Sequence, residues 1–305
     1  MAFEAYIILV LGLGVMVKFS DITVENILNF SKLTGISAMV MGFILLALGT
    51  SLPEMAVVIT SSIKGENIVG VSTLFGSNIA DLAILGIAAL LISFRIPKED
   101  QKSMTQVILV TSAISFLALV LGSINFVFGI FTIIVFYLIT KPIVHEGIEN
   151  TKETIKSFET FKSLLEIFIS LAVVLASAWV VTESTIVISK DLGVYQSFIG
   201  ATLIAASTSL PEFIVSVSAI RRGNVSLLVG NILGSLMINL TLLLGIAALF
   251  STVILDIPTS TTIGILLLFN FVFLPMIRTR FNKVHGVGIL SMYIVSIFLL
   301  YGVSV

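Results

Sequence analysis

Cysteine is absent from the chain, and histidine occurs only twice, at His145 and His285. The sequence therefore offers no disulfide, no thiolate metal ligand and no thiol nucleophile, and too few imidazoles for a histidine-based metal site or triad. Charge is also scarce, because Asp, Glu, Lys and Arg make up only 11% of the 305 residues and the net charge is −1. A basic surface for nucleic acid is thereby excluded.

Apolar residues are abundant instead, at 57% of the chain. A typical soluble domain carries about 25% charged residues, and a soluble protein as apolar as this one would expose large apolar patches. The surrounding solvent is therefore predicted to be the lipid bilayer. The N-terminal segment carries Glu4 where a signal peptide would be positively charged, so it is expected to remain as the first membrane helix.

Apolar stretches of about 20 residues, the length that crosses a bilayer core about 30 Å thick, recur along the chain. We expect ten spans, at about residues 3–20, 37–62, 68–92, 104–121, 124–141, 164–186, 194–219, 225–251, 256–277 and 286–303. The polar stretches 94–103, 142–163 and 278–285 separate them most clearly. The fold class predicted is an all-α polytopic membrane protein.

The distribution of Lys and Arg predicts the orientation. If the N-terminus lies outside, every Lys and Arg except Lys64 and Lys190 falls on the inner side. With a wrong number of spans, the Lys and Arg residues would have been distributed over both sides of the membrane. We therefore expect a multi-pass protein of the cell membrane with both termini extracellular and a cytoplasmic loop at 142–163.

The pentapeptide TSLPE occurs twice, at 50–54 and at 208–212, an offset of 158 positions. The same offset aligns Gly65 with Gly223 and the dipeptide Gly-Ser at 76 with that at 234. Five spans per repeat is an odd number, so the second half must enter the membrane from the opposite side, as in many secondary transporters. The predicted halves are 1–141 and 164–305, joined by the linker 142–163.

Each copy of the pentapeptide contains a proline, Pro53 or Pro211, in the middle of an expected span. Proline removes one backbone donor and clashes with the preceding turn. A carbonyl near Ala47–Thr50, and one near Ala205–Thr208, should therefore lack its helical partner. Within the bilayer such a group must be satisfied or must line a polar cavity.

Glu54 and Glu212 follow these prolines directly. A carboxylate inside the membrane costs several kcal/mol and usually marks an ion or proton path. If a pseudo-two-fold axis brings both to the bilayer centre, they repel unless one is protonated or a cation lies between them. Structural pairing and a proton relay are the alternatives, and a cation site is the interpretation we favour.

A second polar layer follows each pentapeptide, GSNIAD at 76–81 and GSLMIN at 234–239. Ser77 and Asp81 are four residues apart and share one helix face, as do Ser235 and Asn239. The small residues Gly76 and Gly234 are expected to allow close approach of a neighbouring helix. All the candidate ligands are oxygen donors apart from amide nitrogen, which suits Ca²⁺ and Na⁺ and argues against copper or zinc.

On these residues the sequence resembles the sodium/calcium exchangers of the calcium/cation antiporter superfamily, with α-repeats at 42–81 and 200–239. The resemblance implies a secondary antiporter, not an enzyme, that exchanges Ca²⁺ for Na⁺ by alternating access while long helices one and six slide over the bundle. It implies a Ca²⁺ site of Glu54, Glu212, Thr50 and Thr208, and Na⁺ or central ligands Ala47, Ser51, Ser77, Asp81, Ala205, Ser209, Ser235 and Asn239. No resident cofactor and no obligate protein partner are expected; the partners are Ca²⁺, Na⁺ and lipid.

The sequence departs from the family at the central pair, because Asp81 and Asn239 stand in the reverse of the usual order. The Thr-Ser that precedes each glutamate resembles the sodium-coupled branch, since the proton-coupled branch usually has Gly-Asn there. The 142–163 loop is too short for the calcium-sensing domains of animal exchangers. A Ca²⁺/H⁺ antiporter that uses the same acids is the nearest alternative, and a cation channel is a more distant one.

Three acids lie outside these motifs, near the ends of the first and sixth expected spans: Asp21, Glu25 and Glu183. We expect them to be solvated at the level of the lipid headgroups, with a role in ion access as the alternative. Trp179 is expected to be an interface or packing aromatic.

Overall fold

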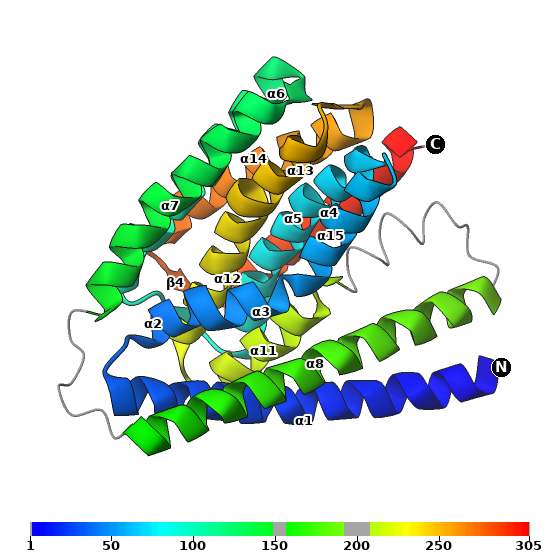
Figure 1. Cartoon of the computed structure of the whole chain (residues 1–305). Coiled ribbons are helices and arrows are strands. Elements are labelled where there is room, and N and C mark those ends of the chain that lie inside the picture. Colours follow the sequence, from blue (N-terminus) through cyan, green and yellow to red (C-terminus); the bar gives the residue numbers. More distant parts are fainter. Residues whose placement is uncertain (1, 149–156, 192–207, 305) are drawn as a thin grey trace.

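The computed structural model describes residues 2–148, 157–191 and 208–304, and these residues are mostly helical (Figure 1). Up to residue 148 the elements are α1 (Ala2–Thr34), α2 (Ala38–Met41), the π-helical η1 (Gly42–Leu46), α3 (Ala47–Thr50), α4 (Leu52–Ile63), α5 (Asn67–Leu91), β1 (Phe94–Arg95), α6 (Lys98–Leu121), β2 (Ser123–Ile124) and α7 (Phe126–Ile148). From residue 157 they are α8 (Ser157–Asp191), α11 (Leu210–Arg221), α12 (Val225–Met237), the π-helical η3 (Ile238–Leu243), α13 (Leu244–Phe250), β3 (Val253–Ile254), α14 (Ile257–Met276), β4 (Arg280–Phe281) and α15 (Lys283–Ser304).

Among the described residues, 8 helices are long and apolar enough to cross a membrane, or up to 9 if the bent pair formed by Ala38–Thr50 and Leu52–Ile63 is one span. The expected span at 194–219 falls partly outside the described residues, and its described part is α11. The helical membrane class is therefore confirmed, whereas the total of ten spans stays a prediction.

The first helix is longer than expected, because α1 continues to Thr34 where the prediction ended at residue 20. The segment after residue 20 is rich in polar residues, but it keeps Val24, Ile27 and Phe30 at helical spacing, and all three are buried. α1 lies side by side with the 35-residue α8 (Figure 1). The apolar stripe on α1 thus extends the helix beyond what crossing the bilayer requires.

The two copies of the pentapeptide adopt the same local structure. The helix breaks at Ser51 (φ −82°, ψ 7°) and again at Ser209 (φ −85°, ψ 4°), and each break is followed by a 12-residue helix with proline in its first turn. A glycine with positive φ stands two residues after the end of α4 and of α11, Gly65 at 77° and Gly223 at 71°. Glycine adopts this conformation without steric cost. The first break bends the chain by 43°.

Two short antiparallel ribbons join segments far apart in the sequence. β1 pairs with β4, where Phe94 stacks on Phe281 with ring centroids 5.0 Å apart, and β2 pairs with β3. Since α6 runs from β1 to β2 and α14 runs from β3 to β4, the ribbons lie at opposite ends of the α6–α14 pair.

The starts of α5 and α12 also lie at opposite ends of the bundle. The Ser226 hydroxyl at the start of α12 donates to the Asp100 carboxylate at the start of α6, 2.6 Å away, which places it at the β1–β4 end. The Asn67 amide at the start of α5 donates to Ser251, just before β3, which places it at the β2–β3 end. The turns that follow α4 and α11 therefore lie at opposite ends of the molecule.

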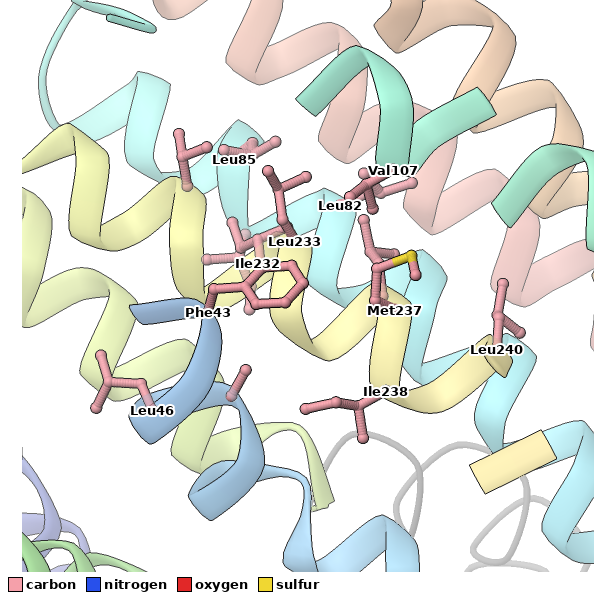
Figure 2. Packing of buried hydrophobic residues seen from close by; sticks show 14 of the residues in the cluster. Phe43, Leu46, Leu82, Leu85, Val107, Ile232, Leu233, Met237, Ile238 and Leu240 are labelled. Carbon is pink, nitrogen blue, oxygen red and sulfur yellow. The ribbon is translucent and has the colours of Figure 1, made fainter. Parts of the chain in front are cut away.

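The core of the bundle is built around α12 and η3, which pack against η1 and α3 on one side and α5 and α6 on the other. Figure 2 shows this packing; the labelled residues are Phe43, Leu46, Leu82, Leu85, Val107, Ile232, Leu233, Met237, Ile238 and Leu240, and all are buried. A Cβ atom on Gly42 would lie 2.6 Å from the Leu227 carbonyl oxygen. Close backbone contact at this glycine therefore sets the spacing of η1 and α12.

The two motif glycines differ in what surrounds them. A Cβ on Gly234 would lie 2.5 Å from the Phe43 carbonyl oxygen, so the expected close approach of a helix is confirmed there. At Gly76 a Cβ would meet none of the described residues within 4 Å. At Gly234 the neighbours are η1 and α3. The segment equivalent to them by the offset of 158 lies almost wholly outside the described residues, so the expected close approach at Gly76 stays a prediction.

Candidate cation site

Glu54 and Glu212 lie in the first turns of α4 and α11, and the side chain of each is only 1% exposed. The helix breaks at Ser51 and Ser209 create these first turns inside the bundle. The partial positive charge at a helix N-terminus favours a carboxylate there. The pentapeptide thus places one acid at each of two internal helix starts.

The acids from the two pentapeptides lie close to one another. The Glu212 carboxylate is within electrostatic range of Glu54 and of Asp81. The threonines are arranged crosswise, because Thr208 lies beside Glu54 and Thr50 lies beside Glu212. Each glutamate is therefore flanked by a threonine that comes from the other copy of the motif.

The serine and amide side chains of the second polar layer complete the cluster. The Ser77 hydroxyl is 3.4 Å from a Glu54 carboxylate oxygen, and the Ser235 hydroxyl donates to the Asp81 carboxylate at 2.5 Å. The Asn239 amide nitrogen lies 3.4 Å from the Ser235 oxygen. α5 and α12 thus both contribute to one buried polar network.

Asn78, which the sequence analysis did not select, links these two helices directly. Its amide oxygen accepts a hydrogen bond from the Asn239 amide nitrogen at 2.9 Å, and its own amide nitrogen donates to the Leu236 carbonyl at 3.3 Å. These bonds turn the Asn239 oxygen away from Asn78. The sequence could have indicated Asn78 through its spacing, because it lies three residues before Asp81 on the same helix face.

Buried oxygen atoms without a hydrogen-bond partner are concentrated in this cluster. They are Oγ of Ser51 and of Ser209, Oε2 of Glu54, both carboxylate oxygens of Glu212, Oδ1 of Asp81 and Oδ1 of Asn239. Buried polar atoms in proteins are normally hydrogen-bonded, so a group of orphaned oxygens calls for an explanation. Oxygen ligands are what Ca²⁺ requires.

Carboxylates alone do not form the site. In the part of the chain that the structure describes, no three His, Cys, Asp or Glu side chains are close enough to hold one metal ion together. Hydroxyl and carbonyl oxygens would have to supply the remaining ligands. The Thr50 hydroxyl donates a hydrogen bond to the Leu46 carbonyl at 2.9 Å, which leaves the lone pairs of its oxygen for a cation.

The carbonyl that proline frees can be identified in the first copy. Pro53 has no N–H, so Gly49 lacks its usual helical donor, while the Ala47 carbonyl already accepts from the Ser51 N–H at 3.0 Å. Ala47 is buried in α3, as the predicted role would require. In the second copy, Ala205 lies outside the described residues, and only Thr208 and Ser209 of that region can be placed.

A buried, oxygen-rich cluster at the breaks of apolar helices defines a class of protein, the multi-pass membrane transporters of cations. The chain belongs to the sodium/calcium exchanger protein family, which it matches over residues 4–140 and 162–302. The members of this family are membrane exchangers rather than enzymes.

Individual relatives match nearly the whole chain. It is 28% identical to the sodium/calcium exchanger MaX1 of Methanosarcina acetivorans, covering 97% of this chain and 98% of that protein. It is 27% identical to the inner membrane protein YrbG of Escherichia coli, with 97% of each covered. A solved structure of the sodium-calcium exchanger NCX_Mj superimposes with a TM-score of 0.87 at 25% identity, covering 97% of this chain and 99% of that one.

Proposed function

We propose that this protein exchanges Ca²⁺ for Na⁺ across the cell membrane by alternating access. Ca²⁺ binds between Glu54 and Glu212 with oxygens of Thr50 and Thr208. Na⁺ and the central position use Ala47, Ser51, Ser77, Asp81, Ala205, Ser209, Ser235 and Asn239. The two ions neutralise the same acids in turn, and this competition couples their movements.

The observation that carries the proposal is the set of orphaned buried oxygens. Seven of the buried oxygen atoms without a hydrogen-bond partner belong to six residues of the proposed ligand set. Leaving so many polar atoms unpaired in a protein interior is costly. A bound hard cation, with six to eight oxygen ligands in the case of Ca²⁺, satisfies them together.

The ten spans form two inverted halves, 1–141 and 164–305, with the linker 142–163 in the cytoplasm and both termini outside. Two contacts support this arrangement, because they join residues that are 158 positions apart and so are equivalent in the repeats. The Asn270 amide donates to Ser112 at 3.0 Å, and Asn78 donates to the Leu236 carbonyl. A residue can touch its own equivalent only near the axis that relates the two halves.

Coupling to Na⁺ rather than H⁺ is supported by the hydroxyl groups. Ser51 and Ser209 stand directly at the two helix breaks, and the hydroxyl oxygens of both are buried and unpaired. A proton relay needs only the carboxylates. The two unpaired hydroxyl oxygens beside them are added oxygen ligands of the kind that a monovalent metal ion binds.

The purified protein in liposomes tests this coupling. Uptake of radioactive calcium is measured with Na⁺ inside and none outside, and in parallel with a pH gradient and no Na⁺. An outward Na⁺ gradient should drive calcium in, and the pH gradient should not. Uptake driven by the pH gradient alone would show a Ca²⁺/H⁺ antiporter, and flux independent of any counter-ion would show a channel.

A further inference from the structure

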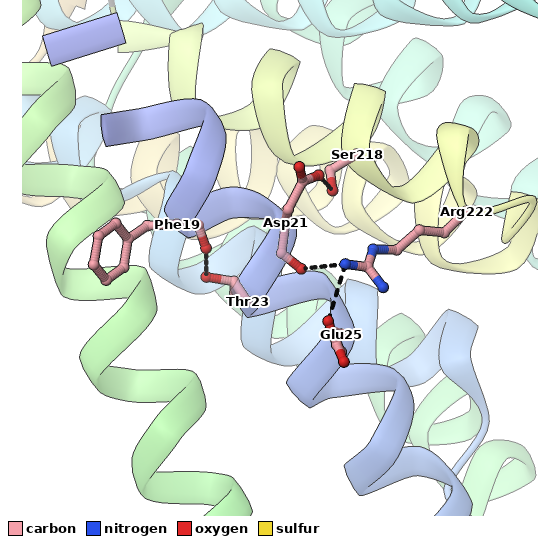
Figure 3. Close-up of polar contacts among 6 residues, drawn as sticks. All are labelled: Phe19, Asp21, Thr23, Glu25, Ser218 and Arg222. Atoms are coloured by element: carbon pink, nitrogen blue, oxygen red, sulfur yellow. Dashed lines mark hydrogen bonds and ion pairs between the residues drawn. The ribbon is translucent and has the colours of Figure 1, made fainter. Parts of the chain in front are cut away.

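A polar contact outside the cation site ties α1 to α11 (Figure 3). The Ser218 hydroxyl donates to the Asp21 carboxylate. The Arg222 guanidinium donates to the Asp21 backbone carbonyl at 3.1 Å and pairs with the Glu25 carboxylate at 3.1 Å. Asp21 is therefore partly exposed and also bonded to α11, while its position at the headgroup level stays a prediction.

The position of this contact suits it to hold α1 against the bundle. α1 and α8 run along each other, and α1 reaches the remainder of the bundle chiefly through α11 (Figure 1). The buried apolar residues of α1, such as Met16, Val24 and Ile27, impose little directional preference. The hydroxyls of the buried Thr23 and Thr34 donate to carbonyls of α1 itself, so they do not orient it against the bundle. The polar contact with α11 is directional, so it defines one position of the α1–α8 pair relative to the bundle.

The repeat offset of 158 relates this contact to a second pair of residues. Glu25 corresponds to Glu183 on α8, and Arg222 corresponds to Lys64 after α4, so the sign of each charge is kept. The turns after α11 and α4 lie at opposite ends of the molecule, as the Ser226–Asp100 and Asn67–Ser251 bonds require. The second pair would therefore act at the other end.

That second pair is apart in this structure. The Glu183 carboxylate accepts instead from the indole nitrogen of Trp179 on its own helix, at 3.4 Å. Lys64 and Glu183 form no ion pair with each other, although both belong to the described residues. One of two repeat-equivalent charge pairs is thus closed while the other is open.

We propose that Glu25–Arg222 and Lys64–Glu183 are alternating latches, of which one closes in each access state. The inference rests on the proposed alternating access of two inverted halves, in which the halves exchange conformations. The present structure is the state in which the α11 end is latched. Transport moves the α1–α8 pair, opens Glu25–Arg222 and brings Glu183 to Lys64.

The latches would set the balance between the two states without binding the transported ion. A contact made in only one state shifts the equilibrium by its own free energy. An exposed ion pair is weak, and its loss shifts a two-state equilibrium by about fivefold at most. Arg222→Ala should therefore increase the population with the Lys64–Glu183 latch closed by up to about fivefold.

The absence of cysteine makes a cross-linking test direct. The second latch is followed in a variant that carries Lys64→Cys and Glu183→Cys, as the full chain in liposomes. The measured quantity is the initial rate at which a short bifunctional thiol reagent cross-links the two cysteines. A protease site introduced into the 142–163 segment turns each cross-link into a gel shift, because the two cysteines then lie on different fragments. Glu25→Cys with Arg222→Cys reports the first latch in the same way.

Arg222→Ala should raise the cross-linking rate of the 64–183 pair several-fold. The matched control is Lys102→Ala, which breaks another exposed ion pair, with Glu146 (2.7 Å) between α6 and α7. This pair lies away from the α1–α8 pair, so its loss should change nothing. The charge exchange Glu25→Arg with Arg222→Glu should restore the original rate, which excludes a folding defect as the cause.

An unchanged 64–183 rate in Arg222→Ala, or no reaction of that pair under any ion condition, would overturn the latches. Neither readout depends on calcium flux. Failure of the proposed exchange would appear separately, as absent Na⁺-driven uptake by the unmodified protein.

Discussion

Replacing Glu54 by glutamine should have opposite effects on stability and on ion binding. Glu54 is 1% exposed, with one carboxylate oxygen 3.4 Å from Ser77 and the other without a partner. Without a cation, an uncompensated buried carboxylate costs several kcal/mol, whereas an imperfectly bonded amide costs about 1–3 kcal/mol. In ion-free buffer, Glu54→Gln should therefore unfold at the same temperature as the original protein or higher.

Calcium should raise the melting temperature of the original protein but not that of the variant. A ligand at a hundred times its dissociation constant stabilises the folded state by about 2.7 kcal/mol. With an unfolding entropy of about 2.1 cal/mol/K per residue, this corresponds to about 4 °C for a chain of 305 residues. The original protein should show this rise in Tm, and Glu54→Gln and Glu212→Gln should show none.

Unfolding scans in detergent, with and without calcium, measure both effects, and uptake of radioactive calcium into liposomes measures transport. The matched control is Asp100→Asn, which removes a buried carboxylate that is bonded to Ser226 outside the site and should keep the calcium-dependent rise. If Glu54→Gln retained the full rise in Tm and normal uptake, the assignment of the site would be refuted.

Three further substitutions test the packing around the site. Asn78→Ala removes the hydrogen-bond partner of the Asn239 amide. It should lower the unfolding free energy by about 1–3 kcal/mol and weaken calcium binding, measured as the calcium-dependent rise in Tm. Unaltered calcium binding would exclude Asn78 as a positioning residue. Gly42→Ala should lower the unfolding free energy by about 1–3 kcal/mol, because its Cβ would lie 2.6 Å from the Leu227 carbonyl oxygen. Gly76→Ala, whose Cβ would meet none of the described residues within 4 Å, should be neutral or slightly stabilising. Equal melting of the Gly42 and Gly76 variants would contradict this reading of the packing.

Much of the architecture could be predicted because it depends on local pattern. Membrane spans follow from the length of apolar runs, and the breaks at Ser51 and Ser209 follow from the prolines two residues later. The positive φ of Gly65 and of Gly223 occurs at equivalent places because both copies have a glycine eleven residues after the glutamate of the pentapeptide. The burial of Glu54 and Glu212 also follows from their position within apolar segments.

Other features were decided only by contacts between distant segments. Asn78 could be singled out only once α12 was seen to bring Asn239 within 2.9 Å. For Asp21 the sequence indicated a headgroup-level acid, and only the structure showed that α11 brings Ser218 to it. The sequence by itself determined the solvent, the repeat and the helix breaks, since these depend on neighbouring residues in the chain. Only the tertiary structure decided which polar side chains meet, because each meeting joins helices whose separation in sequence carries no information about their separation in space.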